Sequence, residues 1–223
     1  MQNELFNTKI KHTKIHQIFY DWGLGFNDLF KKSMDSFKGM KGLEYKLWNQ
    51  QECEELLSKY NEFESMYYSC KYEIMKVDII RFIILYEYGG LYADLDVIPV
   101  VEELPHYEFA VSKNDYELNV EVLLSVKENK ILLDYLHHIE KQIELKNQMD
   151  IYKVWKLRYV HQTTGPKSFG RFLKGKDFKI LKLNKPSSTL QSKLDLNLKG
   201  DEEFISYPSC SYSESFGLKN YAL

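Results

Sequence analysis

Residues 77–99, VDIIRFIILYEYGGLYADLDVIP, decide the fold, and the rest of the chain is interpreted around them. Their first half predicts a helix, because apolar residues recur on nearly every turn. Gly89-Gly90 predicts the end of this helix, since glycine accepts the left-handed backbone of a C-terminal cap. Residues 91–98 then alternate in character, which predicts a strand that points Asp94 and Asp96 the same way, about 6.6 Å apart.

Two carboxylates this close repel each other and raise each other's pKa unless a positive charge lies beside them. A divalent cation is the simplest such charge, because hard oxygen ligands suit Mg²⁺ or Mn²⁺. These ions are often held by one or two carboxylates together with the oxygens of a substrate phosphate. The pair therefore indicates a phosphorylated ligand. A bare Asp-x-Asp is frequent by chance, so its surroundings decide how much weight it carries.

Those surroundings form one longer pattern, Asp78-x-x-Arg81 followed by Leu85-Tyr86-x-x-Gly89-Gly90-Leu91-Tyr92-x-Asp94-x-Asp96. The pattern resembles the signature of glycosyltransferase family 32, the DXD sugar transferases that include yeast mannosyltransferases and bacterial capsular polysaccharide enzymes. The family is related to the catalytic domain of the large clostridial glucosylating toxins. The resemblance implies an α/β fold of the GT-A type, with a mixed central sheet and helices on both faces. From its length, the chain is expected to form a single domain over residues 1–223, with one domain and a small helical appendage as the alternative.

The resemblance also implies roles for individual residues, with Asp78, Arg81, Asp94 and Asp96 forming the catalytic set. Asp96 resembles the direct metal ligand, and Asp94 the residue that contacts the ribose or sugar and the metal's water shell. Asp78 and Arg81 resemble the pair that holds the hydroxyl groups of the donor sugar, and Tyr92 resembles a wall of the donor pocket. The alternative for Asp78 and Arg81 is a salt bridge on a solvated helix face, since such pairs are common and weak.

Weaker similarities to the same family lie on either side of the central stretch. Residues 14–20 resemble its opening strand, with Phe19 in the place of a Trp that stacks on the nucleotide base. Trp48 and Asn49 resemble base or ribose contacts, with an ordinary helix cap as the equal alternative for Asn49. Gly165 belongs to a Thr-Gly-Pro loop similar to one that opens a helix near the donor, where free N–H groups favour an anion.

The C-terminus departs from the family pattern. Relatives end in a His followed by Ser-Trp, whereas this tail contains no His and has Phe216 in the Trp place. Glu214 or Ser215 would then complete the metal shell, so the expected metal ligands are Asp94, Asp96 and Glu214. A disordered end and a weakly bound metal are the equal alternatives.

Other parts of the chain predict further strands and helices. Asn27 and Asn129 are expected to start helices, the second running through Leu145. Residues 43–48, 108–111, 120–124 and 178–183 are expected to form strands of the sheet.

Composition places the chain among ordinary globular proteins, with 44% hydrophobic and 28% charged residues. The three cysteines are widely spaced and form no CxxC pair, which suggests neither a zinc site nor a disulfide framework. The first residues, MQNELFNTKIKHTK, lack the apolar stretch of a signal peptide or anchor. We therefore expect a cytoplasmic protein.

Charge is distributed unevenly along the chain, although the net value is only −2. Residues 153–185 contain 10 basic side chains and one acidic side chain, Asp177. Such a segment could attract a pyrophosphate donor, an anionic acceptor or an anionic membrane surface, and a solvated basic face is an equal alternative. Nucleic acid is not an expected partner, because no recognition motif accompanies the basic segment.

The predicted function is that of a metal-dependent, retaining glycosyltransferase of polysaccharide biosynthesis that uses Mn²⁺ or Mg²⁺. It would move a hexose from a nucleotide-diphosphate sugar, UDP being favoured over GDP, to a hydroxyl of a saccharide or glycolipid acceptor. One alternative is a protein of the same fold that binds sugar nucleotide or carbohydrate with little or no turnover. Another is a haloacid-dehalogenase phosphatase, for which residues 200–203 are the only candidate for the later acidic residues.

Overall fold

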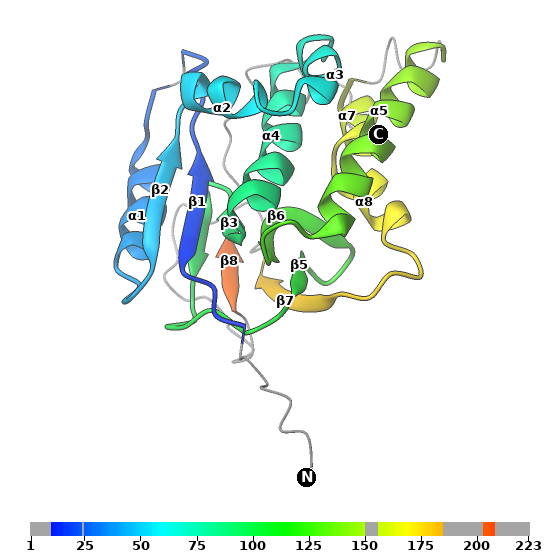
Figure 1. Cartoon of the computed structure of the whole chain (residues 1–223). Coiled ribbons are helices and arrows are strands. Elements are labelled where there is room, and N and C mark those ends of the chain that lie inside the picture. The colour runs from blue at the N-terminus through cyan, green and yellow to red at the C-terminus, as the bar shows by residue number, and fades with distance from the viewer. Residues whose placement is uncertain (1–9, 24, 150–155, 185–202, 208–223) are drawn as a thin grey trace.

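The computed structural model describes residues 10–23, 25–149, 156–184 and 203–207 of the 223-residue chain. Within these residues, eight strands form one sheet in the order β2-β1-β3-β6-β5-β7-β8-β4 (Figure 1). The strands are β1 (Lys14–Ile18), β2 (Glu44–Trp48), β3 (Gly90–Ala93), β4 (Val97–Pro99), β5 (Phe109–Lys113), β6 (Leu118–Ser125), β7 (Lys179–Asn184) and β8 (Phe204–Ser206).

The sheet is mixed, as predicted. Strand β1 runs parallel to both β2 and β3, whereas β6 is antiparallel to its neighbours β3 and β5. Strand β7 is parallel to β5 and β8, and β4 closes the order as the antiparallel partner of β8. Because β1 and β3 are parallel neighbours, their carboxyl ends lie at the same edge of the sheet, where α/β folds usually bind ligands.

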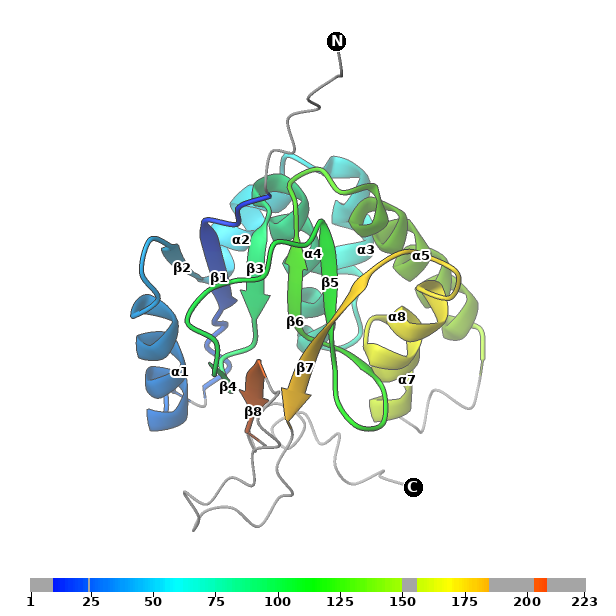
Figure 2. The same ribbon diagram turned by 90° about the horizontal axis from the view of Figure 1, so that it is seen from below.

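Helices cover both faces of the sheet, which was also predicted (Figure 2). Helix α1 packs on one face with β4, and the remaining helices lie on the other face. The helices are α1 (Asp28–Lys38), α2 (Gln50–Leu57), the 3₁₀ turn η1 (Asn61–Phe63), α3 (Glu64–Tyr68), α4 (Glu73–Tyr88), α5 (Lys130–Asn147), α7 (Lys156–Thr163) and α8 (Pro166–Phe172). Among the described residues, no helix combines the length and apolarity needed to cross a bilayer.

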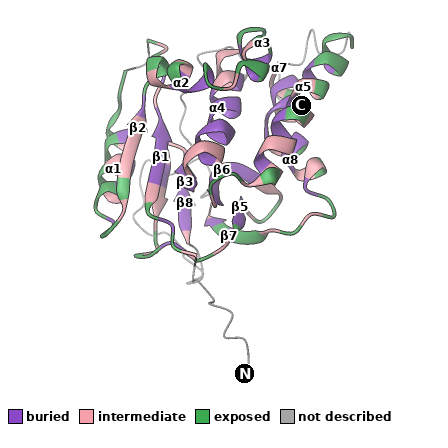
Figure 3. Ribbon diagram, viewed as in Figure 1, coloured by how far each residue is buried: buried purple, intermediate pink, exposed green. Residues whose placement is uncertain are grey.

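Helix α4 lies at the centre of the larger hydrophobic core. It packs against β1, β3 and β6 on one side and against α2, α3 and α5 on the other, so nearly its whole surface from Val77 to Leu85 is buried (Figure 3). This explains a sequence that is apolar on almost every turn. It also places Asp78 and Arg81 in the interior, with 5% and 3% of their surfaces exposed. The alternative of a solvated salt bridge is therefore wrong.

The structure corrects the predicted strand over residues 91–98. Strand β3 ends at Ala93, and the N–H of Asp94 makes a last bond to the carbonyl of Glu121 on β6, 2.8 Å long. The chain then turns, with the N–H of Val97 donating to the carbonyl of Asp94 at 3.1 Å. It leaves β6 because β4 pairs with β8 instead, a partner far along the sequence.

The predicted helix starts agree with the structure. Asn27 and Asn129 accept backbone N–H groups of α1 and α5, and Asn49 forms a reciprocal capping box with Glu52 at the start of α2. The expected strands over residues 43–48, 108–111, 120–124 and 178–183 correspond to β2, β5, β6 and β7. Local hydrogen-bonding residues and hydrophobic periodicity were sufficient to locate these elements.

Candidate functional site

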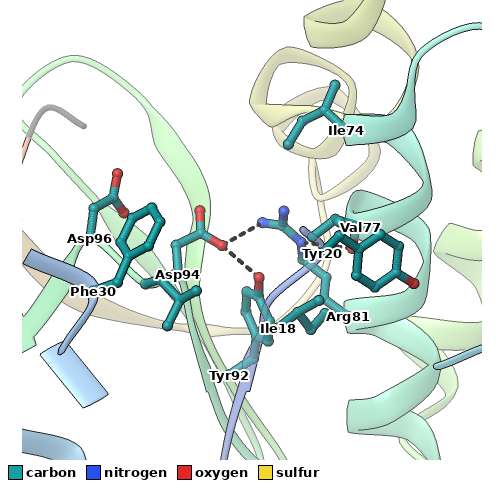
Figure 4. Close-up of a pocket in the computed structure, with 10 residues that line it drawn as sticks. Ile18, Tyr20, Phe30, Ile74, Val77, Arg81, Tyr92, Asp94 and Asp96 are labelled. Carbon is teal, nitrogen blue, oxygen red and sulfur yellow. Dashed lines mark hydrogen bonds and ion pairs between the residues drawn. The ribbon is translucent and has the colours of Figure 1, made fainter. Parts of the chain in front are cut away.

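A cavity opens where the chain leaves β1 and β3 (Figure 4). It has an empty volume of about 410 Å³, which includes the part open to solvent. Its lining comes from the end of β1, from α1, from the first half of α4 and from the turn after β3, and consists of Ile18, Tyr20, Phe30, Ile74, Val77, Arg81, Tyr92, Asp94, Leu95 and Asp96. Two predicted metal ligands, Asp94 and Asp96, therefore share this cavity with Arg81 and Tyr92.

The backbone of the Asp94 turn is held by a polar network that the sequence did not reveal. The side-chain amide of Gln17 donates to the carbonyl of Asp94 at 3.1 Å and to the hydroxyl of Ser33 at 2.9 Å. Ser33 in turn donates to the carbonyl of Val97, and the hydroxyl of Tyr45 donates to Gln17 at 2.9 Å. These bonds come from β1, α1 and β2, so three elements orient the turn.

Arg81 connects helix α4 to the sheet. Its guanidinium donates to Asp78 at 2.8 Å and to the carbonyl of Val120 at 2.9 Å, and its Nε donates to the carbonyl of Val77 at 3.3 Å. The same group lies 3.4 Å from the carboxylate of Asp94. Burial alone would lower the pKa of Arg81, but the surrounding acidic groups, led by Asp94, raise it. The guanidinium is therefore a permanent cation at the wall of the cavity.

Asp94 receives two donors on one oxygen, as Figure 4 shows. The hydroxyl of Tyr92 donates to its Oδ1 at 2.6 Å, and Arg81 lies 3.4 Å from the same atom. Burial raises the pKa of Asp94 to about 6, with Arg81 opposing the rise and Glu121 adding to it. With 27% of its side chain exposed, Asp94 can still present a carboxylate oxygen to a ligand in the cavity.

Asp78 lies deeper than the cavity wall. One of its oxygens accepts from Arg81 and the other accepts from the hydroxyl of Thr164 at 2.6 Å. Burial raises the pKa of Asp78, although Arg81 and Thr164 both act to lower it. The predicted contact of Asp78 with a donor sugar stays a prediction. Thr164 belongs to the Thr-Gly-Pro loop that precedes α8. No local sequence signal pairs it with Asp78, which lies 86 positions away.

The predicted nucleotide contacts lie at different depths. Phe19 follows β1 directly and packs edge-on against Phe26 and Phe30, with ring centroids 5.1 and 6.3 Å apart, so it lies beside the cavity wall. Trp48 is 3% exposed, and its indole N–H donates to Nδ1 of His16 at 3.2 Å. The side chain of Asn49 accepts the N–H of Glu52, so it acts as a helix cap. The structure does not bring Trp48 and Asn49 to the cavity lining.

The remaining predicted residues are Gly165 and Glu214. Gly165 precedes α8, and its own N–H donates to the carbonyl of Val160 at 2.9 Å. The expected anion contact at the start of this helix stays a prediction. A side chain there would approach the backbone of His161 to 3.0 Å, which favours glycine. Glu214 lies outside the described residues.

The carboxylates suit a cation whose coordination is only partly supplied by protein. Asp94 and Asp96 contribute hard oxygen ligands to one cavity. In the part of the chain that the structure describes, no group of three His, Cys, Asp or Glu side chains is placed to hold a metal ion. Two carboxylates fit Mg²⁺ or Mn²⁺, which take their other ligands from water and phosphate oxygens.

Comparison with known proteins gives matches over the same region. Residues 21–107 match the family described as glycosyltransferase sugar-binding region containing DXD motif. Inositol phosphoceramide mannosyltransferase 3 of Schizosaccharomyces pombe (strain 972 / ATCC 24843) is 44% identical over 55 residues, which cover 24% of this chain and 15% of that protein. Inositol phosphoceramide mannosyltransferase 1 of the same organism is 31% identical over 90 residues, which cover 37% of this chain and 27% of that protein.

The fold also has a counterpart among solved structures. The PaToxG glycosyltransferase superposes with a TM-score of 0.51 at 16% identity, covering 73% of this chain and 69% of that one. The comparisons confirm the predicted resemblance to DXD glycosyltransferases and the α/β fold of the GT-A type. The chain spans only 15% and 27% of the two yeast relatives.

Proposed function

We propose that this chain, whose residues 21–107 carry the glycosyltransferase sugar-binding region with its DXD motif, transfers a hexose from a nucleotide-diphosphate sugar to a hydroxyl group. The observation that carries the proposal is the placement of Asp94 and Asp96 on one turn, in one cavity, beside the buried cation of Arg81. A diphosphate sugar is the ligand class that this charge pattern suits, because it presents both anionic and hydroxyl groups.

Asp94 and Asp96 would hold Mn²⁺ or Mg²⁺, and Glu214 remains a third candidate ligand. When bound, such an ion neutralises negative charge on a departing diphosphate. The contribution of this chain's own residues is to fix the carboxylates. Gln17 orients the backbone of the turn, while Tyr92 and Arg81 hold the Asp94 side chain. Preorganised groups of this kind need little rearrangement when charge develops.

Arg81 would stabilise negative charge on the donor side of the cavity. Its bonds to Asp78 and to the Val120 carbonyl keep the guanidinium in one orientation, and its centre lies 4.9 Å from the ring centroid of Tyr92. We take UDP as the favoured nucleotide and retention as the stereochemical course, as the resemblance to family 32 implies. The base would stack near Phe19, which lies beside Phe30 at the cavity wall.

The acceptor would be a saccharide or a glycolipid. A lipid-linked acceptor is supported by the names of the two yeast relatives, both inositol phosphoceramide mannosyltransferases. The basic segment 153–185 supports contact with an anionic membrane, because its described part exposes six cationic side chains: Arg158, Lys167, Arg171, Lys174, Lys179 and Lys182.

A donor-turnover assay tests the proposed function. Purified protein is incubated with UDP-hexoses and Mn²⁺, and the release of UDP is measured with and without saccharide acceptors. Asp94→Asn and Asp96→Asn are each expected to reduce turnover by about 100-fold or more, since charged groups at the reacting diphosphate are lost. Asp134→Asn, on the outer face of α5, is the control and should retain turnover. Equal turnover in the wild type and both site variants would contradict the proposal.

A binding protein of the same fold is the second candidate. It is favoured by Phe216, which stands where the family pattern has a Trp. The two functions differ in one outcome, because the binding protein would take up nucleotide sugar in the presence of Mn²⁺ without releasing UDP. The fold comparison gives no support to the phosphatase alternative.

A further inference from the structure

We propose that Thr164 is a positioning residue of the donor site, which acts through Asp78 and Arg81 on Asp94. The inference rests on the proposed function and deepens it. Its basis is a continuous line of short contacts, in which the hydroxyl of Thr164 meets Asp78, Asp78 meets Arg81, and Arg81 meets Asp94. The distances along the line are 2.6, 2.8 and 3.4 Å.

Both backbone groups of Thr164 are hydrogen-bonded. It is fully buried, its N–H donates to the carbonyl of Val160 at 3.0 Å, and its carbonyl accepts from the hydroxyl of Tyr135 at 3.0 Å. It lies between α7 and α8, whereas Tyr135 belongs to α5. The hydroxyl that reaches Asp78 is thus held by two packed helices, which makes it a rigid donor.

The contact matters because Asp78 is shielded from water. Its two oxygens divide their bonds between the Thr164 hydroxyl and the Arg81 guanidinium. A buried carboxylate that loses one donor must recover the lost interaction from its neighbours or take up a proton. Either response changes how the Arg81 guanidinium divides its contacts between the carboxylates of Asp78 and Asp94. The guanidinium would move toward Asp78 in the first case and lose its counter-charge in the second.

Thr163, the last residue of α7 and the direct neighbour of Thr164, provides a matched control. It is the same residue type and is also fully buried, but its hydroxyl donates to the carbonyls of Tyr159 and Val160 at 2.7 and 3.2 Å. Those partners belong to its own helix, α7. Valine is nearly the same size as threonine, so either substitution removes one buried hydroxyl with little change in volume. Only Thr164→Val breaks the hydrogen bond to Asp78.

The test measures the dissociation constant of UDP with Mn²⁺ by calorimetry, for wild type, Thr164→Val, Thr164→Ser and Thr163→Val. GDP is measured in parallel. We expect Thr164→Val to weaken binding by about tenfold or more, the effect of losing a hydrogen bond to a charged group. Thr164→Ser keeps the hydroxyl and should restore binding to within about threefold of wild type, and Thr163→Val should lie in the same range. Thermal unfolding of each variant shows that it is folded.

Each outcome decides a different question. If wild type binds and Thr164→Val binds as well as Thr163→Val, the role of Thr164 is wrong while the proposed function stands. If wild type binds neither nucleotide, the proposed function fails and takes this inference with it. Should Thr164→Val not fold, Thr164→Ala replaces it, because alanine also removes the hydroxyl but places no additional methyl group against the Asp78 carboxylate. The same tenfold loss is expected, and wild-type affinity in Thr164→Ala would overturn the inference.

Discussion

Arg81 is the residue on which the site depends most at the scale of single side chains. It is 3% exposed and donates to a carboxylate and two backbone carbonyls from three different positions on its guanidinium. Only arginine has donors arranged in a planar fork of this kind. Without Arg81, the carboxylates of Asp78 and Asp94 would repel each other with no cation between them.

Arg81→Met is therefore expected to lower the free energy of unfolding by roughly 3–5 kcal/mol, the usual cost of breaking a buried ion pair by removing one partner. Urea unfolding measures the change. The control is Lys130→Met, which breaks an exposed pair with Asp134, 2.8 Å long, and should cost at most about 1 kcal/mol. Similar losses in the two variants would contradict the role given to Arg81.

The types of the site residues could be predicted from the sequence, but their contacts could not. The spacing of Asp78 and Arg81 placed them on one helical edge, and the alternation around Asp94 and Asp96 gave both a shared direction. The cavity lining agrees with the second prediction even though the backbone is a turn rather than a strand. The bond from Thr164 to Asp78 was not predictable, because no periodicity relates residues that far apart in sequence.

At the scale of elements, the start of β3 shows how closely two strands can approach. Gly90 has φ +97°, and a side chain there would clash with the backbone carbonyl oxygen of Lys14 on β1. Gly42, before β2, also has a positive φ of +74°, but it has open space around it. A substitution at Gly42 therefore tests backbone strain alone, whereas a substitution at Gly90 tests backbone strain together with a steric clash.

Gly90→Ala is expected to lower the free energy of unfolding by about 3 kcal/mol or more, because left-handed strain and a backbone clash add together. Gly42→Ala should cost about 1–2 kcal/mol, from the backbone term alone. Chemical denaturation of the two variants measures the difference. Equal losses would mean that β1 and β3 can separate at little cost, contrary to the packing described.

His16 links three elements. Its Nε2–H donates to the carbonyl of Gly89 at the end of α4, 2.9 Å away, and its Nδ1 accepts the indole N–H of Trp48 on β2 at 3.2 Å. The bond from Trp48 requires the neutral ring, because a protonated Nδ1 would face another donor. Burial, with Lys14 and Lys46 nearby, lowers the pKa of His16 to about 4.

The sign of the pH effect follows from this lowered pKa. Between pH 6.5 and 4 the unfolded chain binds a proton at His16 that the folded protein does not, so stability falls as pH falls. The full difference is roughly 3 kcal/mol. The slope of the unfolding free energy against pH reports the difference in bound protons between the unfolded and folded chain. In His16→Gln this slope should be smaller, by an amount that corresponds to up to one proton. An unchanged slope would show that His16 is not kept neutral.

The sequence predicted most elements but misplaced the end of β3. Helix α4 ended at its two glycines as expected, because the cap residue decides that boundary locally. The turn at residues 94–96 depends instead on the pairing of β4 with β8. That pairing joins residues more than 100 positions apart, and such contacts leave no local pattern.

At the scale of the whole molecule, the cavity lies at the meeting point of several independent parts. The end of β1, the turn after β3 and the buried helix α4 all contribute to it, and α1 closes its other side. The α/β class, the mixed sheet and the presence of helices on both faces followed from the sequence pattern and its family resemblance. The strand order did not, because it is decided by long-range pairing and by the placement of β7 and β8. The single-domain expectation for residues 1–223 stays a prediction.

The most direct test of the central claim is a thermal-unfolding series of the wild-type chain with UDP or GDP, each with and without Mn²⁺. A ligand at 100 times its dissociation constant adds about 2.7 kcal/mol of stability, which for a chain of this size raises the melting temperature by roughly 5 °C or more. We predict that rise for one nucleotide only when Mn²⁺ is present, and its loss in a variant with alanine at both Asp94 and Asp96. A nucleotide shift that is the same with and without Mn²⁺, or that survives the double substitution, would contradict the claim that these carboxylates bind a diphosphate through a divalent cation.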